Sequence, residues 1–273
     1  MKFIPVTTYG RWFPIDSQIQ PHLPKFVDDV MVSYQFAQHM KKRPPLTLWI
    51  DSGGYATHRP IARVLPMKDR AGFTVAGEVL TPEKVLAFQE RHADVGFTLD
   101  FILVPDLGTA ECTRRYDWTI QNALWAQQHR TNMRMQLYAS VQALCPTTAR
   151  EAARIYRQQG MDGIGVGGLV PRIRDWKALT RILEAVLEEA GNTPVHAFGL
   201  GTPALLKLLQ KMGVSSSDSS SYVQWAGFQK NWKGRVATAP LSEAATVRLA
   251  LSNLSELLQT VGLQRMEPFQ QAG

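Results

Sequence analysis

The sequence has 273 residues, of which 45% are hydrophobic and 19% are charged, so the chain can bury one sizeable core. No apolar run approaches the ~18–20 residues of a membrane span, the N-terminus has no signal-peptide pattern, and Cys112 and Cys145 are too few for a disulfide framework or a multi-cysteine zinc site, so we expect a cytoplasmic globular protein. The net charge of +7 favours a polyanionic partner such as nucleic acid, with a basic, solvated enzyme surface as the alternative.

Short apolar segments that resemble strands recur along the chain. They are rich in β-branched or aromatic residues and do not alternate strictly with polar residues, a pattern typical of a parallel sheet buried on both faces. The segments are residues 2–8, 46–51, 100–106, 135–142, 163–168 and 195–201, with 234–240 as a further candidate. The serine-rich segment 215–221 occupies the place of one more strand, although its composition is also typical of a flexible linker.

Helices with recognisable ends separate these strands. They cover residues 81–96, 147–160, 174–191, 201–213 and 241–262. Thr81 and Thr202 stand as N-caps before prolines, and Thr148 with Glu151 has the spacing of a capping box. Because alternating strands and helices imply right-handed crossovers, we predict a single irregular (β/α)8 TIM-like barrel domain over residues 1–273. An open doubly wound α/β sheet is the alternative.

In such a barrel, functional side chains gather at the carboxyl ends of the strands, which form the mouth. The residues that the predicted strands place there are Asp51, Ser52, Asp106, Gln142, Gly167, Gly168, Phe198, Gly199 and Asp218. Each has a local alternative role, such as an Asx-turn, a helix cap or a turn glycine, and their common location is what favours a site. Residues 52–80 are expected to form a long loop after a strand, whereas Asp162 precedes its strand and belongs at the opposite end.

Aromatic residues stand beside several of these positions. Tyr55 follows two glycines and Phe198 precedes Gly199, so the two rings could enclose a flat heterocycle, with core packing as the alternative. His196 lies in mid-strand and is expected to be a packed core histidine.

A second aromatic segment follows the serine-rich run, over residues 222–235. Its aromatic residues, including Trp225, alternate with Lys230, Lys233 and Arg235. Aromatic stacking combined with basic side chains suits a splayed nucleotide strand, and an amphipathic cover that closes the barrel is the equal alternative.

Several short motifs carry a resemblance to a known family. They are DSGGY (51–55), VPD (104–106), SVQ (140–142), GVGGL (165–169), FGLGTP (198–203) and the acid Asp218. In order and approximate spacing they are similar to the motifs of the tRNA-guanine transglycosylases, and the resemblance covers roughly residues 46–220. These enzymes use a barrel scaffold to exchange a guanine base in nucleic acid for a 7-deazaguanine.

The resemblance implies a role for each matching residue. Asp218 corresponds to the nucleophile that attacks the sugar C1′ carbon, and Asp51 to the general acid/base. Asp106, Gln142 and the backbone at Gly168 correspond to groups that recognise the purine edge. The stacking faces correspond to Tyr55 and Phe198, and Ser52, Gly167 and Gly199 complete the expected base site. No cofactor or metal is implied beyond the incoming base.

The sequence also departs from the family pattern. Usual members have a cysteine-rich zinc site after the nucleophile, but no cysteine follows Cys145 here. Ile173 stands where some bacterial members have an acid, which favours a neutral base such as 7-cyano-7-deazaguanine over a cationic one. With no RNA-binding extension evident, the chain looks most like the DNA-modifying paralogues of the DpdA type, so we prefer DNA to tRNA as substrate.

Other interpretations stay open at this point. One is a tRNA-acting transglycosylase, and another is a non-catalytic nucleic-acid-binding subunit of the same fold. A third is a phosphate-binding barrel enzyme that uses the glycine-rich loops after the late strands. A homodimer or partner modification proteins are compatible with each interpretation.

Overall fold

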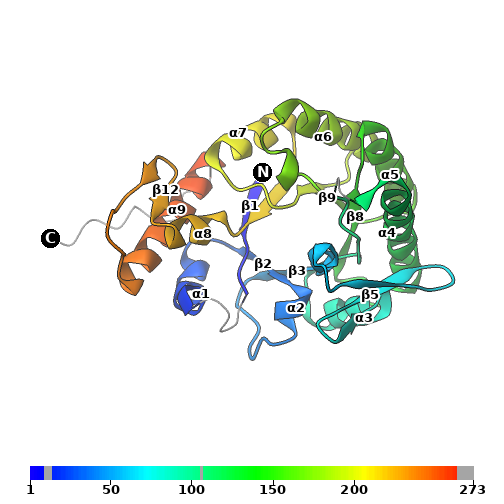
Figure 1. Cartoon of the computed structure of the whole chain (residues 1–273), viewed down its shortest axis with the longest axis horizontal. Coiled ribbons are helices and arrows are strands. Elements are labelled where there is room, and N and C mark those ends of the chain that lie inside the picture. Colours follow the sequence, from blue (N-terminus) through cyan, green and yellow to red (C-terminus); the bar gives the residue numbers. More distant parts are fainter. Residues whose placement is uncertain (9–13, 105–106, 263–273) are drawn as a thin grey trace.

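The computed structural model describes residues 1–8, 14–104 and 107–262. Eight parallel strands form one sheet, in the order β1-β11-β10-β9-β8-β7-β3-β2. The strands are β1 (Lys2–Pro5), β2 (Asp29–Ser33), β3 (Thr47–Asp51), β7 (Val95–Phe97), β8 (Gln136–Gln142), β9 (Gly163–Gly167), β10 (Val195–Ala197) and β11 (Ser216–Ser219). A parallel bridge between Val6 and Met31 joins the β1 and β2 edges. The sheet is thus a nearly closed barrel, as predicted (Figure 1).

Helices lie outside the strands (Figure 1). They are α1 (Pro14–Ile19), α2 (Tyr34–Ala37), α3 (Pro82–His92), α4 (Thr109–His129), α5 (Pro146–Gln158), α6 (Trp176–Ala190), α7 (Pro203–Met212), α8 (Ser221–Gly227) and α9 (Glu243–Thr260), with short 3-10 turns η1 (Gln20–Lys25), η2 (Gly54–His58) and η4 (Val170–Arg172). The predicted caps Thr81 and Thr202 accept hydrogen bonds from the first turns of α3 and α7. The predicted capping box at Thr148 and Glu151 is wrong, because Cys145 is the N-cap and Thr148 bonds back to it. Among the described helices, none has an apolar stretch long enough to cross a bilayer.

The eighth barrel strand is not the predicted segment 234–240. Gly234–Arg235 (β13) instead pairs with Lys230–Asn231 (β12) in a separate antiparallel hairpin. The barrel strand that the sequence did not predict is β2, which pairs with β3 in parallel over five residue pairs. Its sequence, DVMVS, is short and follows a proline-rich turn, so no strand was expected there.

The predicted strand at 100–106 is also wrong, because the barrel strand β7 lies earlier, at Val95–Phe97. Its apolar run is buried, but side chains from other elements satisfy its backbone. Thr119 Oγ1 accepts from the amide of Phe101, and Asn122 Nδ2 donates to the carbonyl of Leu99. A segment whose polar groups are paired in this way needs no neighbouring strand.

The expected long loop after β3 contains a small sheet of its own. After η2, three antiparallel strands follow, namely β4 (Arg63–Pro66), β5 (Ala71–Val75) and β6 (Glu78–Leu80). The amide of Asn122 on α4 exchanges two hydrogen bonds with the backbone of Ala71, which fixes this sheet against the barrel.

The barrel interior is packed with aromatic side chains, and glycines on β9 make room for them. Ile4, Met31, Trp49, Val95, Phe97 and Tyr138 form this inner cluster. A Cβ on Gly163 would overlap the ring of Tyr138, and one on Gly165 would overlap Phe198 and Phe97. Ile164 and Val166, which alternate with these glycines, belong to the outer core under the helices. The inside of the barrel below the carboxyl ends of the strands is therefore filled by packed, mainly aromatic side chains.

Candidate functional site

The serine-rich segment is a barrel strand and not a linker. β11 lies between β1 and β10, and its four residues Ser216–Ser219 are all buried. Ser217 Oγ donates to the carbonyls of Ala197 and Leu200 at 2.8 and 2.7 Å. Small hydroxyl side chains thus bind the strand to the loop after β10, and Asp218 is held in place near the end of the strand.

One oxygen of the Asp218 carboxylate accepts two hydrogen bonds from the protein. Oδ1 accepts from His196 Nε2 and from the backbone N–H of Gly199, each at 3.0 Å. Gly199 has φ = 74°, a left-handed conformation that glycine adopts without strain. Within the described part of the chain, Oδ2 has no hydrogen-bond partner, and the residue retains 7% of its accessible surface. One carboxylate oxygen is therefore available to a reacting group.

Three polar side chains at or just beyond the carboxyl ends of the neighbouring strands β3, β7 and β8 form a buried network. Ser52 Oγ donates to Asp100 Oδ1 at 2.6 Å, and Gln142 Nε2 donates to Asp100 Oδ2 at 2.7 Å. All three are at most 5% exposed. Gln142 Oε1 is buried without a hydrogen-bond partner in the described structure. A buried acceptor left unpaired costs free energy, which indicates a ligand group or water at this point.

The glycines of the DSGG and GVGG motifs have steric roles here. Gly53 adopts φ = 80°, and the amide of Gly54 donates to Ser52 Oγ at 3.0 Å. A Cβ on Gly54 would overlap the Asp100 carboxylate, and one on Gly167 would overlap the Gln142 amide. These glycines let the polar groups approach the backbone closely, which explains why the motifs stand beside these acids.

Asp51 is the third acid at the mouth, at the carboxyl end of β3. Burial raises the pKa of Asp51 from its usual 3.8 to about 7, and the nearby carboxylates of Asp100 and Asp218 add to this rise. Hydrogen bonds from the backbone of Ser52 and Gly53 oppose it. Burial also raises the pKa of Asp100, against its hydrogen bonds from Ser52 and Gln142. Asp51 can therefore hold or release a proton near neutral pH.

The network contains an acid, Asp100, that the sequence analysis did not single out. Asp106 lies outside the described residues, and the carboxylate that joins Ser52 and Gln142 belongs to Asp100. The available signal was the short segment VGFTLD, in which an acid follows an apolar run. The longer run FILVP, just after Asp100, led to a strand being expected at residues 100–106, downstream of β7.

The two aromatic residues predicted to enclose a base, Tyr55 and Phe198, differ in burial. Tyr55 is 66% exposed on η2, with its ring centroid 4.3 Å from that of His58. Phe198 is half-buried and packs against Phe97 at a centroid distance of 4.7 Å. Phe198 is thus packed into the base of the site, whereas Tyr55 is exposed beside His58. Their enclosure of a base stays a prediction.

A cation lies beside the glycine pair after β9. The guanidinium of Arg172 donates to the carbonyl of Gly168. A Cβ built on Gly168 would lie 3.3 Å from Arg172 Nη1 and 3.4 Å from Gln142 Oε1, so the cation borders the same space as the unpaired amide oxygen. Ile173 follows in an exposed position. Sequence reasoning identified Gly168 and Ile173 and missed Arg172.

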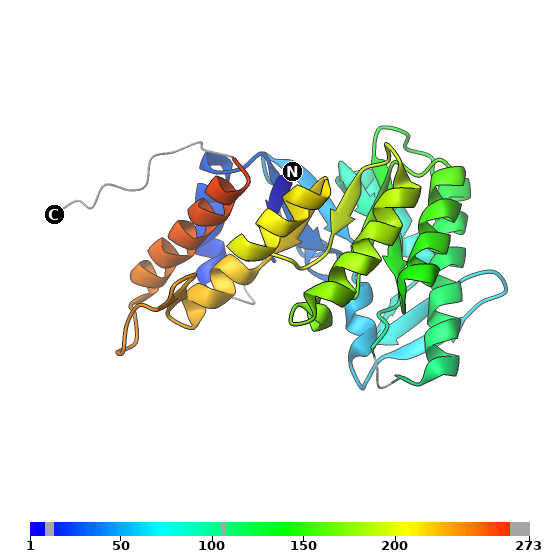
Figure 2. The same ribbon diagram turned by 90° about the horizontal axis from the view of Figure 1, so that it is seen from above.

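The segment between β11 and α9 contains the predicted nucleic-acid contacts. It holds α8 and the β12–β13 hairpin, and this orange segment lies at the lower left of Figure 2. Lys230, Lys233 and Arg235 are exposed, and Trp225 packs on Trp232 with ring centroids 5.1 Å apart. The hairpin is therefore a packed support whose basic groups face solvent.

The same segment does not fit the family zinc site. Residues 219–242 contain neither cysteine nor histidine, the side chains that such a site uses. Across the described ranges, no group of three or more His, Cys, Asp or Glu side chains is placed to hold a metal. Helical and hairpin packing against α9 takes the place of a metal here: Trp232 Nε1 donates to the carbonyl of Asn253 at 3.0 Å.

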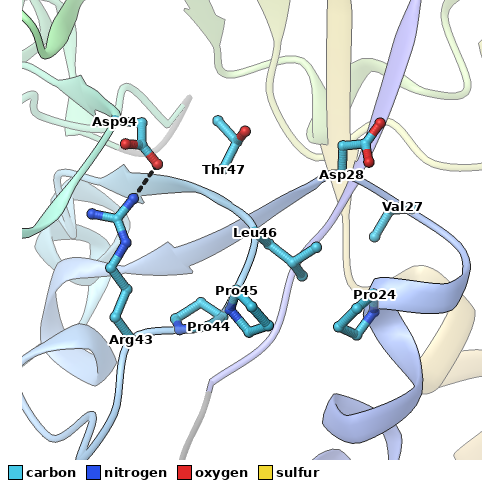
Figure 3. Close-up of a pocket in the computed structure, with 9 residues that line it drawn as sticks. All are labelled: Pro24, Val27, Asp28, Arg43, Pro44, Pro45, Leu46, Thr47 and Asp94. Atoms are coloured by element: carbon cyan, nitrogen blue, oxygen red, sulfur yellow. Dashed lines mark hydrogen bonds and ion pairs between the residues drawn. The ribbon is translucent and has the colours of Figure 1, made fainter.

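A pocket of about 520 Å³ lies at the opposite end of the barrel, before β2, β3 and β7 (Figure 3). Prolines line much of it, and Arg43 forms an ion pair with Asp94 across one side. Asp162 is also at this end, where it accepts from the amide of Leu137 and pairs with Arg130. Polar groups at this end of a barrel typically serve stability, as was predicted for Asp162.

The fold and the mouth together define a TIM-like barrel with three clustered acids and a buried amide, suited to proton transfer and to recognition of a polar heterocycle. A family model described as queuine tRNA-ribosyltransferase matches residues 34–245. The chain belongs to this family, and the resemblance to tRNA-guanine transglycosylases is confirmed.

Curated relatives carry the name tRNA-guanine(15) transglycosylase. The protein of Methanococcus aeolicus is 27% identical over 161 residues, which cover 56% of this chain and 25% of the relative. That of Methanococcus maripaludis strain C5 is 29% identical over 174 residues (61% and 26%), and that of Thermococcus onnurineus 26% over 155 residues (55% and 26%). The matched part of the chain thus spans about a quarter of the length of these relatives.

Proposed function

We propose that the protein exchanges a guanine base in nucleic acid for a 7-deazaguanine through a covalent intermediate on Asp218. The observation that carries this proposal is the hydrogen bonding of Asp218. Its Oδ1 atom is held by two donors, and its Oδ2 atom is left to react. Family membership supports the same reaction class. A non-catalytic subunit would have no use for three acids at one mouth.

Two acids divide the work in the proposed reaction. Asp218 Oδ2 forms a bond to the sugar C1′ as the bond between C1′ and the base breaks, and the departing base takes a proton from Asp51. In the second step the incoming base returns a proton to Asp51, and its nitrogen displaces Asp218 from C1′. A pKa of about 7 suits Asp51 to both directions of this proton transfer.

The network around Asp100 is proposed to recognise the purine edge, in the role first given to Asp106. Guanine has N–H donors on its Watson–Crick edge, and Asp100 has acceptor capacity left beside Ser52 and Gln142. The unpaired Gln142 Oε1 offers a further acceptor. A base without matching donors would leave buried acceptors unpaired, at a cost of about 1–3 kcal/mol each.

We further propose that the incoming base is neutral, such as 7-cyano-7-deazaguanine. Arg172 beside Gly168 places a permanent positive charge next to the purine site. A cationic aminomethyl base would be repelled there, and Ile173 supplies no compensating acid.

For the nucleic acid, we propose tRNA, with DNA as the alternative. The names of the curated relatives favour tRNA over the DNA that the missing zinc site had suggested. The exposed cations Lys230, Lys233 and Arg235 are suited to phosphate contacts with either polymer. The target nucleotide of a paired region would have to be flipped out to reach the mouth.

The test is incorporation of labelled guanine or 7-cyano-7-deazaguanine into tRNA or DNA, together with isolation of the covalent adduct under denaturing conditions. We expect incorporation into tRNA and an adduct with the wild type. Asp218→Asn should abolish both while nucleic-acid binding is retained. Asp117→Asn makes the same change at an exposed carboxylate of α4 and should leave both unchanged.

Each outcome decides a different part of the proposal. An adduct that persists in Asp218→Asn would exclude Asp218 as the nucleophile. Incorporation into DNA but not tRNA would restore the original DNA preference. Release of no base from either polymer would favour a binding subunit.

A further inference from the structure

His196 is an unusual residue for the interior of a barrel. It lies on β10 with no accessible surface, yet both ring nitrogens have polar partners on β11. Nδ1 is 2.9 Å from Ser216 Oγ, and Nε2 is 3.0 Å from Asp218 Oδ1. The two partners are two residues apart on one strand, so their side chains point to the same face. The imidazole therefore bridges them along β11.

Aromatic rings enclose the imidazole and fix its orientation. The ring centroids of Trp49, Phe97 and Phe198 lie 5.6, 5.2 and 4.8 Å from that of His196. Backbone pairing of His196 with Ser216 sets the register of the two strands. A ring packed on several sides and bonded at both nitrogens has little freedom to rotate, so its donor to Asp218 is preorganised.

The hydrogen-bond partners assign the tautomer. An ionised carboxylate only accepts hydrogen bonds, so the proton belongs on Nε2. Nδ1 then accepts from the Ser216 hydroxyl, which can rotate to donate. Gly199 N–H is the second donor to the same Oδ1 atom. Both donors thus act on the oxygen that does not react.

We infer that His196 is a positioning residue that drives breakdown of the covalent intermediate, an inference that rests on the proposed function. Once Oδ2 is bonded to C1′, Oδ1 is the carbonyl oxygen of the ester and keeps both donors. When the incoming base attacks C1′, the C1′–Oδ2 bond breaks and its electron pair returns to the carboxylate. The negative charge spreads to Oδ1, where the imidazole N–H and the amide of Gly199 stabilise it.

Two substitutions separate this role from packing. His196→Phe fills the aromatic cage without a donor, and His196→Gln places an amide N–H near the position of Nε2. In single-turnover measurements on purified adduct, we expect His196→Phe to slow release by the incoming base on the order of 100-fold. His196→Gln should recover much of that loss. His129→Gln makes the same change at an exposed site on α4 and should match the wild type.

A packing role predicts the reverse order, with Phe at least as active as Gln. Adduct breakdown at the wild-type rate in His196→Phe would overturn the inference. Should that variant not fold, Ser216→Ala removes the Nδ1 partner while the packing stays in place, and it should slow breakdown to a smaller extent. An unchanged rate in Ser216→Ala would also count against the inference.

A second measurement separates this inference from the proposed function. Nitrogen NMR of the protein labelled in histidine reports which ring nitrogen carries the proton, with no substrate present. We expect a protonated Nε2 in the wild type, altered in Asp218→Ala. A neutral ring protonated only at Nδ1 overturns the inference even if base exchange is observed. Absence of any adduct in the wild type overturns the proposed function. In that case the tautomer still tests whether His196 Nε2 donates a hydrogen bond to Asp218.

Discussion

Asp100 is the residue on which base selectivity should depend most. It is buried, and each of its carboxylate oxygens already accepts one hydrogen bond. Asp100→Asn keeps the shape but replaces an acceptor with an N–H2 donor, which would face the donors of Gln142 or of guanine. Because a hydrogen bond to a charged group is worth about 1.5–3 kcal/mol, we expect exchange to fall by about 10–100-fold.

The measurement is the exchange rate as a function of base concentration, with Asp117→Asn as control. A higher KM for the base, with adduct formation on the nucleic acid retained, would support a role in base recognition. Equal losses in adduct formation and base affinity would instead indicate general damage to the mouth.

Arg172 gives a second prediction at the scale of single residues. Arg172→Gln removes the charge beside Gly168 but retains a side chain that can donate to its carbonyl. We expect the variant to accept the aminomethyl base better relative to the cyano base, by roughly 5–10-fold for one unit charge at partly screened distance. Competition between the two labelled bases measures this ratio. An unchanged ratio would remove Arg172 as the source of selectivity.

At the scale of elements, β9 shows how a strand without large side chains determines the site. Gly163, Gly165 and Gly167 alternate along β9, and each gives room to a ring or amide from another element. Gly165→Ala would press on Phe198 and Phe97, so we expect about 1–3 kcal/mol of destabilisation from overpacking. Thermal unfolding measures it. Gly227→Ala, at a position with open space around it, should change stability little.

The β12–β13 hairpin provides a prediction about nucleic-acid binding. Replacing Lys230 and Lys233 with alanine should weaken binding to tRNA and reduce the salt dependence of log Kd by about one per lysine if each contacts a phosphate. Lys207→Ala with Lys211→Ala is the matched control, because both side chains are exposed on α7. Titrations at several salt concentrations distinguish the two pairs. A salt slope equal to that of the control pair would mean that the hairpin only covers the barrel.

Sequence patterns predicted the helix ends better than the strands, for a physical reason. The caps at Thr81 and Thr202 are local, so a few residues are enough to specify them. By contrast, β2, β7 and β10 are three to five residues long and owe their existence to neighbours in the barrel. The apolar run after Asp100 looks more like a strand than β7 does, yet distant side chains satisfy its backbone.

For the whole molecule, the motifs predicted the barrel and most of the mouth. The carboxyl ends of parallel strands converge whatever their exact bounds, so Asp51, Gln142 and Asp218 were placed correctly. What the sequence could not supply was pairing between side chains. The bridge of His196 to Asp218 and the cation of Arg172 at Gly168 depend on strand register and turn geometry that only the folded chain defines.

The clustered acids also make the stability of the whole molecule depend on pH. The folded pKa of Asp51 is about 7, above its usual 3.8, so the folded state keeps a proton that the unfolded chain has released. Stability contributed by this group is therefore present at low pH and is lost as the pH rises from about 4 to about 7. Above that range the fold must hold a third carboxylate beside Asp100 and Asp218.

Asp51→Asn removes this titration, because the amide stays neutral at every pH. We expect the variant to unfold close to the wild-type temperature at pH 4, where Asp51 is protonated in the folded state and partly protonated in the unfolded state, but several degrees higher at pH 8, while base exchange is lost for want of a proton donor. Calorimetry at the two pH values measures the difference, and Asp117→Asn should follow the wild type at both. A variant less stable than the wild type at pH 8 would mean that the ionised Asp51 is favoured by the fold, and that the proton it is proposed to transfer is absent near neutral pH.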